Sequence, residues 1–236
     1  PGNEVFTEGV YDVEKVDFSP KVSEWEFTVH MAGEVTNPWD KPAGFSLQMF
    51  QLYIQDPNAA DDAIKGTEGR DGVTSTFQEA YHYRVVVQGG KQMIEDPNGS
   101  VVSEEVSASA DPDNGTISFT LPKSAFATKD FNELKLAMME YSFDDYGTGW
   151  VRALGSESDT WTVGGADANA IGSAPRALEL IGPSAVVDQQ EALSYSQDAP
   201  ASVPLYKGKE LLTGEPDTAL TAIVKPGPTV FSTVDV

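Results

Sequence analysis

The sequence predicts an all-β protein: one antiparallel, immunoglobulin-like β-sandwich followed by an extended, proline-rich C-terminal segment. Three observations lead to this fold class. The dominant hydrophobic period is two residues, the spacing of a strand that buries one face. Asp-Pro and Asn-Gly turn signals separate the apolar runs. No long segment has the period of an amphipathic helix. Short strands divided by such turns are typical of a β-sandwich.

The expected strands differ in how many faces they bury. Glu24–Met31 alternates apolar and polar residues, which indicates one wet face. Gly44–Ile54 is apolar at both parities and is therefore expected to be a central strand covered on both sides. The remaining expected strands are 80–87, 116–121, 134–141 and 160–163.

The turns and the C-terminal part complete the predicted organisation. Asn114-Gly115 precedes a strand and predicts a hairpin, and Pro122–Thr128 is expected to start one short helical turn. The pattern weakens after Gln189, so we expect a sandwich over residues 1–205 and an extension over residues 206–236 that wraps the sandwich or leads away from it. An edge strand or hairpin is expected there, over 219–224 and 230–234.

Composition excludes several classes of protein. The chain has 236 residues, 15 Lys+Arg, 37 Asp+Glu and no cysteine, for a net charge of −22. Disulfides and thiolate metal sites are therefore excluded. Nucleic acid and anionic membranes would meet a field of their own sign, and no apolar run is long enough to insert in a bilayer. We expect an acidic, solvated protein that works outside the cell.

Two long motifs carry a resemblance to a known family. The first is Asn37-Pro38-Trp39 followed by Gly44–Ile54, and the second is Trp161–Ala166 followed by Pro175–Ile181. Weaker matches occur at 6–13 and 189–194. In this order the segments resemble the C-terminal domain of glucodextranase, a DOMON-like domain related to family 9 carbohydrate-binding modules, over residues 4–205.

The resemblance implies a function. Such domains are extracellular or cell-surface carbohydrate-binding modules without catalytic activity, found on α-glucan-degrading and cell-surface proteins of archaea and bacteria. The expected partner is therefore a polysaccharide, an α-glucan or a cell-surface glycan. A search for catalytic motifs agrees, because the sequence has no Gly-x-Ser-x-Gly elbow, His-Glu-x-x-His helix or phosphate loop.

Aromatic residues in loops are the candidate sugar-binding residues, since a flat ring can stack on a pyranose and nearby polar groups can bind its hydroxyls. Trp39 lies in one such loop. Tyr146 and Trp150 lie in a second, Gly-rich loop that also holds two carboxylates and is flanked by Arg152. The alternative is that these aromatics cap the ends of the sandwich core. Trp25 and Trp161 fall in strand patterns and are expected in the core.

Calcium is the cofactor that the resemblance implies. Family members commonly carry an Asp-rich stretch just before the residues that match Phe6, and the printed sequence starts at Pro1 without it. Calcium needs oxygen ligands gathered from loops. Within the chain, Asp111, Asp113 and Asn114 form one candidate site, and a second acidic turn contains Asp56, Asp61 and Asp62. The alternative for both is an ordinary turn.

Two rival functions remain open. Some DOMON domains bind haem b through Met and His, and the sequence has both residue types, at Met31, Met49, Met138, Met139, His30 and His82. Both histidines fall on the polar parity of their strands, so we expect them at the surface and do not expect haem. The other rival is a cell-surface or filament subunit that self-associates when its C-terminal segment adds to a neighbour's sheet.

Overall fold

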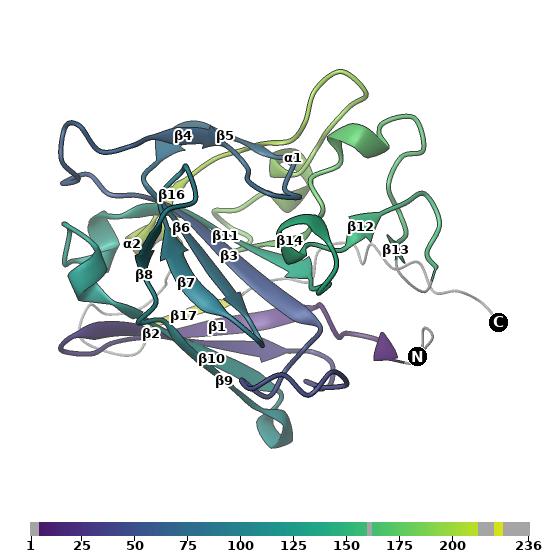
Figure 1. The fold of residues 1–236 in the computed structure, drawn as a ribbon, viewed down its shortest axis with the longest axis horizontal. Coiled ribbons are helices and arrows are strands. Elements are labelled where there is room, and N and C mark those ends of the chain that lie inside the picture. Colours follow the sequence, from purple (N-terminus) through teal and green to yellow (C-terminus); the bar gives the residue numbers. More distant parts are fainter. Residues whose placement is uncertain (1–4, 160–161, 212–219, 224–236) are drawn as a thin grey trace.

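Two antiparallel sheets pack face to face in the computed structural model, which describes residues 5–159, 162–211 and 220–223 (Figure 1). The predicted all-β sandwich is therefore confirmed. The first sheet contains, in spatial order, β17 (Leu220–Ile223), β1 (Val13–Pro20), β2 (Glu24–Met31), β10 (Thr116–Pro122) and β9 (Ser107–Asp111). The second contains β14 (Ala177–Ile181), β11 (Lys135–Ser142), β3 (Gln48–Gln55), β6 (Tyr83–Gln88), β7 (Gln92–Glu95) and β8 (Val101–Ser103).

Smaller elements cover the outer face and the ends of the second sheet. A layer of three strands contains β15 (Ser202–Val203), β5 (Thr76–Tyr81) and β4 (Gly66–Glu68), and lies over β3 and β6 in Figure 1. The other short elements are β12 (Ala153–Leu154), β13 (Thr162–Val163), β16 (Tyr206–Lys207), α1 (Gln189–Ala192) and α2 (Gly208–Leu211). Strand β16 pairs with β11 beside β14.

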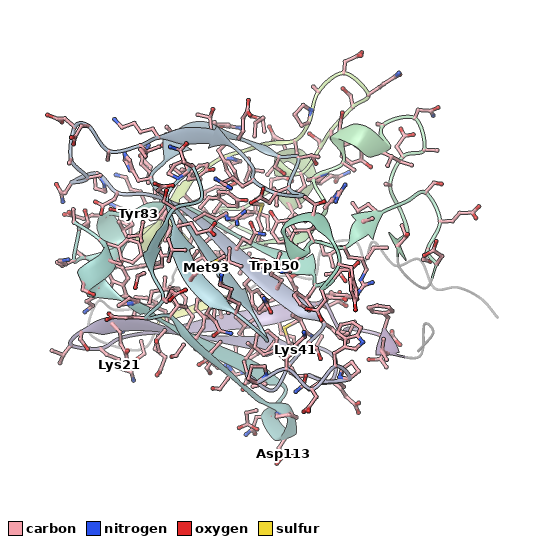
Figure 2. The ribbon with its side chains drawn as sticks, in the orientation of Figure 1. Lys21, Lys41, Tyr83, Met93, Asp113 and Trp150 are labelled. Carbon is pink, nitrogen blue, oxygen red and sulfur yellow. The ribbon has the colours of Figure 1, made fainter. Side chains whose placement is uncertain are left out.

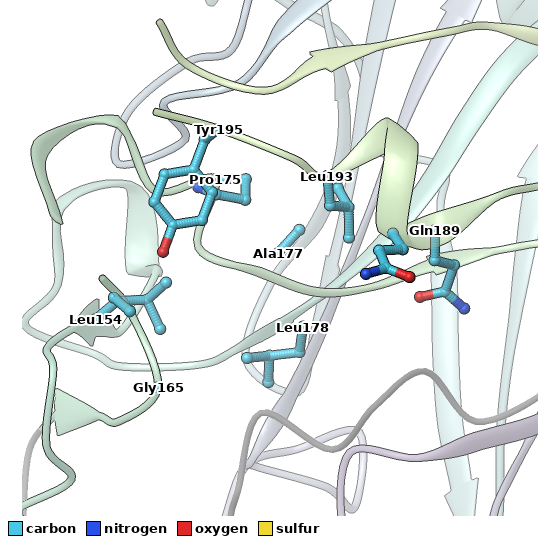
Figure 3. A pocket seen from close by; sticks show the side chains of 10 residues that line it. Leu154, Gly165, Pro175, Ala177, Leu178, Gln189, Leu193 and Tyr195 are labelled. Atoms are coloured by element: carbon cyan, nitrogen blue, oxygen red, sulfur yellow. The ribbon is translucent and has the colours of Figure 1, made fainter. Parts of the chain in front are cut away.

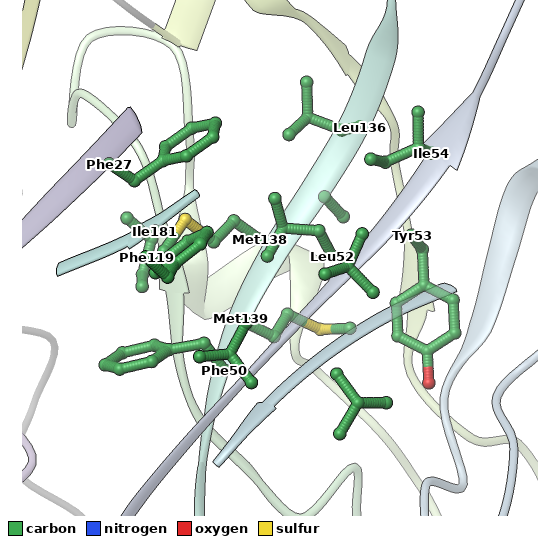
Figure 4. Packing of buried hydrophobic residues seen from close by; sticks show 14 of the residues in the cluster. Phe27, Phe50, Leu52, Tyr53, Ile54, Phe119, Leu136, Met138, Met139 and Ile181 are labelled. Atoms are coloured by element: carbon green, nitrogen blue, oxygen red, sulfur yellow. The ribbon is translucent and has the colours of Figure 1, made fainter. Parts of the chain in front are cut away.

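The hydrophobic core lies between the two sheets, and a second apolar layer lies outside the second sheet. Phe27 and Phe119 stack in the first sheet with ring centroids 4.9 Å apart, and Phe50 of β3 faces them across the sandwich (Figure 4). Tyr53 points the opposite way and packs on Phe77 of β5, at 4.1 Å between centroids. Each such side chain contributes roughly 1.5–3 kcal/mol when fully buried.

Strand β3 is buried on both of its faces, as the sequence pattern predicted. Seven of its eight residues are buried, from Gln48 through Ile54. A strand between β6 and β11, with the first sheet on one face and β5 on the other, has no wet face. Its apolar residues at both parities are the consequence, as the sequence predicted for Gly44–Ile54.

Several local predictions are also confirmed. Strands β9 and β10 form the expected hairpin, in which Gly115 has φ 62°, a left-handed conformation that glycine adopts without strain. A single 3-10 turn, Lys123–Ala125, follows β10. Trp25 is buried in the core. Trp161 and the first half of the expected strand 160–163 lie outside the described residues.

The expected strand over 80–87 was wrong in one respect. The structure has two strands, β5 and β6, which meet at a bend at His82. The bend interrupts the alternation of side chains, so His82 does not reach the surface that its parity predicted. It is buried, with 8% of its area exposed.

The C-terminal part wraps the sandwich as far as it is described. Strand β15 pairs with β5, β16 pairs with β11, and Leu211 at the end of α2 is buried. Residues 206–211 thus pack with the sheet. Strand β17 lies within the expected 219–224 segment and pairs antiparallel with β1. The expected strand at 230–234 lies outside the described residues.

Candidate functional site

The loop that carries Tyr146 and Trp150 is closed by backbone hydrogen bonds. The Asp144 amide donates to the Trp150 carbonyl at 2.8 Å, and the Trp150 amide donates to the Gly147 carbonyl at 2.9 Å. Within this frame the Tyr146 amide donates to the Asp144 carboxylate at 3.0 Å, the local bond that makes Asp frequent at the first position of turns. The loop backbone is therefore held by its own hydrogen bonds.

The two loop aromatics differ in exposure. The Tyr146 side chain is 96% exposed and projects from the loop. Trp150 is partly buried and packs against the core with a positive φ of 62°. The ammonium group of Lys91 lies 5.7 Å from the centroid of the Trp150 ring, a cation–π arrangement. Only Tyr146 offers nearly all of its surface to a ligand.

A neighbouring turn, residues 70–73, packs against the loop that carries Tyr146 and Trp150. A Cβ on Gly149 would lie 1.8 Å from the Asp71 carbonyl oxygen, and a Cβ on Gly72 would lie 2.1 Å from the Thr148 carbonyl oxygen. The two loops therefore pack backbone to backbone, which only glycine permits at these positions. Asp71 itself has a positive φ, 37°. Strained residues of this kind concentrate where the surrounding structure holds a site in place.

Lys41 connects the loop to a second turn, residues 37–41. Its ammonium group forms an ion pair with Asp145 and lies 5.3 Å from the Phe143 ring centroid. The Asn37 side chain closes this turn, because its amide donates to the Lys41 carbonyl and its oxygen accepts from the Lys41 amide, both at 2.8 Å. Figure 2 shows Lys41 and Trp150 on the same side of the sandwich.

Of the other two predicted binding residues, Arg152 lies in the interior and Trp39 is partly buried. Arg152 is 3% exposed and donates to the Ser142 hydroxyl and the Phe143 carbonyl. Its guanidinium lies 5.0 Å from the Phe6 ring and 5.7 Å from the Trp39 ring. Trp39 is partly buried and packs against the core. These residues support the loop; Tyr146, Trp150, Lys41, Asp145 and Lys91 form its outer surface, which we call the Tyr146 surface.

The predicted metal residues lie at the tip of the β9–β10 hairpin, away from this surface (Figure 2). The Asp111 carboxylate accepts from the Asn114 backbone amide at 3.3 Å and from its side-chain amide at 2.7 Å. Asp113 is exposed beside them. Asp111 thus caps its own turn, and nowhere in the described ranges do three or more His, Asp or Glu side chains form a ready-made metal site.

The histidines and the second acidic turn are engaged in local hydrogen bonds. Asp56 is buried and accepts from the Ala127 amide and from the amide and hydroxyl of Thr128. The Asp56 amide donates to Nδ1 of His82 at 3.0 Å. His30 binds the Asp17 carboxylate through Nε2 at 2.8 Å. Asp61 and Asp62 are exposed.

A shallow pocket of about 180 Å³ lies between α1 and the segments around β12 and β14 (Figure 3). Leu154, Leu178 and Leu193 supply apolar walls, Tyr195 supplies a ring, and Gln189 adds an amide. The pocket was not predicted. Its segments had been singled out by the resemblance, at 161–166, 175–181 and 189–194, but sequence alone could not place them around one hollow.

The comparisons with known proteins give one match. A family model described as the C-terminal, SLH-like binding module of glucodextranase matches residues 1–206, which is most of the chain. None of the curated proteins compared with the chain matches it. Across the described residues, every helix is too short or too polar to cross a membrane.

Proposed function

Because the chain belongs to the family of the C-terminal, SLH-like binding module of glucodextranase, we propose that it binds an α-glucan outside the cell, through the Tyr146 surface. The family is one of binding modules, which fits a role without catalysis. The observation that supports this surface is the exposure of Tyr146, 96%, on a loop whose backbone is held by its own hydrogen bonds.

A sugar platform needs a ring that is already in place. An exposed aromatic on a fixed loop loses little conformational freedom when a ligand stacks on it. Polar groups beside the ring then select among sugars by binding their hydroxyls. Lys41, Asp145 and Lys91 supply one carboxylate and two ammonium groups next to the two aromatics. In this role the module would hold an associated glucan-degrading enzyme, or the cell surface, near its polymer.

Affinity electrophoresis tests the platform. We expect the protein to migrate more slowly in a native gel that contains soluble α-glucan than in a gel without it. The Tyr146→Ala protein should lose most of this retardation, and Trp150→Ala should reduce it. The matched control is Val22→Ala, which removes a side chain that is 99% exposed in the turn between β1 and β2.

Two outcomes of the electrophoresis would contradict the proposal. If Tyr146→Ala is retarded as strongly as the parent, the platform lies elsewhere. The Tyr195→Ala protein then tests the pocket of Figure 3, in which the Tyr195 hydroxyl accepts from the Asp167 amide at 2.9 Å. If α-glucan retards neither the parent nor any variant, the proposed ligand class is wrong.

A second function, self-association, is favoured by one observation. Strand β17 adds to the edge of the first sheet by pairing with β1 of the same chain. The same edge would accept β17 from a second copy, by strand addition. A chain that ends at Leu211 keeps β16 and α2, and comparing its mass with that of the full chain by light scattering over a range of concentrations tests the idea. Loss of concentration-dependent assembly in the shorter chain would support it.

A further inference from the structure

One apolar side chain stands almost entirely in solvent at the turn between β1 and β2. Val22 is 99% exposed, more than any other large apolar residue in the described ranges. The Lys21 amide donates to the Glu24 carbonyl at 2.9 Å, which closes the turn. The Lys123 amide donates to the Ser23 carbonyl, also at 2.9 Å. Val22 is therefore an apolar knob on a turn held by hydrogen bonds, and burying it against a partner costs little conformational entropy.

Lysine ammonium groups lie around this knob. The Lys123 ammonium donates to the Lys21 carbonyl, and the Lys129 ammonium donates to the Lys123 carbonyl at 2.7 Å. Lys21 itself pairs with a carboxylate, that of Glu26, at 3.3 Å. Within the described residues, Lys123 and Lys129 donate to backbone carbonyls and to no carboxylate. The acids of the same segments are Glu24, Glu26 and Asp130. The turn is therefore close to neutral in a chain of net charge −22, and two of its bases are available to acids of another molecule.

The pocket of Figure 3 has the shape and polarity to receive such a knob. Its volume is about 180 Å³, and Leu154, Leu178 and Leu193 form its apolar walls. None of its described lining residues is charged. A valine side chain has three carbon atoms, each about the size of a water molecule, whose share of liquid volume is about 30 Å³. The pocket therefore has room for the whole side chain, and filling it removes apolar surface of both partners from water.

Exposed acids lie around the pocket, in contrast to the turn of Val22. Three of them lie beside lining residues, namely Asp167, Asp188 and Glu191. The Asp188 carboxylate accepts from the Glu191 amide at 3.0 Å and caps α1 at the pocket. Arg176, between two lining residues, is the one base in the same segments. The rim of the pocket is therefore acidic, and its charge complements the lysines beside Val22.

The knob and the pocket lie on different sides of the molecule. Lys21, beside Val22, lies at the left of Figure 2, whereas β12, β14 and α1 around the pocket lie well to its right in Figure 1. Val22 therefore does not reach the pocket of its own chain, but it can enter the pocket of a second copy. A contact between two different patches of identical chains is heterologous, and it extends into a ring or an open chain of copies.

We propose that copies of this chain associate head to tail, with Val22 of one copy in the pocket between Leu154 and Leu193 of the next. Burial of apolar surface drives the contact, and the lysines of the first copy face the acidic rim of the second, which fixes their orientation. Because one apolar side chain and a few charges form the contact, it is weak, and we expect assembly at a protein concentration on the order of 1 mM. The contact uses neither the Tyr146 surface nor β17, so it is independent of both proposed functions.

Light scattering over a range of protein concentrations up to about 1 mM tests the contact. The average mass of the parent should rise above that of one chain, 25.3 kDa, and pass that of two, because a head-to-tail contact does not close on a pair. Val22→Asp removes the knob and adds an acid that the pocket rim repels, so it should stay monomeric. Leu193→Lys removes an apolar wall and repels the lysines, so it should stay monomeric too. Val102→Asp changes another exposed valine, 44% exposed on β8, and should assemble like the parent.

A mixture of the two defective variants distinguishes this contact from any other. Val22→Asp keeps an intact pocket, and Leu193→Lys keeps an intact knob. Mixed in equal amounts, they should form pairs and nothing larger, because each pair leaves only a defective knob and a defective pocket. If Leu193→Lys does not fold, Gln190→Lys replaces it, since Gln190 lines the pocket from an exposed position.

Three results would overturn the proposal. The first is a parent that stays monomeric at every concentration, and the second is Val22→Asp that assembles like the parent. The third is a mixture that stays monomeric although the parent assembles. A chain that ends at Leu211 keeps both Val22 and the pocket and should still assemble. Loss of all assembly in that shorter chain would assign the association to strand addition by β17 instead.

Discussion

Two pairs of buried ionisable side chains lie in the same sheet. One pair joins a base to an acid, and the other joins two acids. Arg84 of β6 lies opposite Glu95 of β7, and Glu140 of β11 lies opposite Glu179 of β14. The first pair faces outward, where Arg84 is opposite Tyr53 beneath the small third layer. Its guanidinium donates to the Glu95 carboxylate at 2.8 Å. The second faces inward and consists of two acids.

The difference shows that the backbone ladder fixes which residues meet but not whether their charges balance. Both pairs are nearly inaccessible to water, with Arg84 at 1% and Glu140 at 0% exposure. The Arg84–Glu95 pair neutralises itself within the chain. In the Glu140–Glu179 pair two acids meet, and both carboxylate oxygens of Glu140 are buried without a hydrogen-bond partner.

The largest effect is expected from breaking the balanced pair. Arg84→Met leaves Glu95 in a site where only 7% of the residue is exposed and removes the donor to its carboxylate. Removing one partner of a buried pair costs about 3–5 kcal/mol because the remaining charge is uncompensated. Urea unfolding of the Arg84→Met protein at neutral pH measures this loss.

The double variant Arg84→Met/Glu95→Leu is the control. Replacing both partners of a buried pair by apolar residues of similar volume is often nearly neutral. We therefore expect the double variant to recover most of the stability that Arg84→Met loses. A double variant as unstable as Arg84→Met would mean that the guanidinium contributes through packing, and the contrast between the two pairs would lose its basis.

The pair of two acids should appear as a pH dependence of stability. The folded-state pKa of Glu140 is raised above its unfolded value, so the unfolded chain loses its proton first as pH rises. Stability from this group is complete below about pH 4.5 and falls as pH rises from there. The urea midpoint of the parent should therefore fall between pH 4.5 and 8 more steeply than that of Glu140→Gln.

The contact between Glu140 and Glu179 could not be predicted from the sequence. Residues 134–141 were predicted as an apolar strand, and β11 is an apolar strand. The sequence LKLAMMEY gives no sign, however, that its glutamate is buried against a second glutamate. That contact depends on the register of β11 against β14, some forty residues away. Periodicity describes one strand at a time, so cross-strand partners are invisible to it.

Some of the predicted binding residues lie at the surface and others are buried, for a similar reason. Tyr146 and Trp150 were predicted as binding residues because aromatics in a Gly-rich loop are visible in sequence, and that assignment stays a prediction. Arg152 flanks that loop in sequence, yet it points into the interior, where Ser142 and Phe143 accept its hydrogen bonds. Lys41 reaches the loop from a distant turn and was not predicted. The resemblance identified the family over most of the chain, but not which loops meet.

His82 is a single buried titratable group, and its effect on stability should be smaller than that of either buried pair. Burial and the charge of Lys65 lower its pKa, while Asp56 raises it. A base with a lowered folded pKa stabilises the fold above the unfolded value of about 6.5, and this stability is lost as pH falls below it. His82→Asn keeps an acceptor for the Asp56 amide and cannot titrate. Its urea midpoint should vary less between pH 7 and 5 than that of the parent.

The exposed pair Lys41–Asp145 is the surface counterpart and should contribute least to stability. Asp145 is 45% exposed at its side chain and Lys41 is 18% exposed. Water and salt screen such a pair, which usually contributes about 0–1 kcal/mol. A double-mutant cycle of Lys41→Met and Asp145→Asn should give a coupling free energy in that range, shrinking further in 1 M salt. The same two variants should weaken α-glucan retardation if the pair orients sugar hydroxyls beside Tyr146. A coupling as large as that of Arg84–Glu95 would show instead that this pair holds the fold together, and its position beside the loop would say nothing about binding.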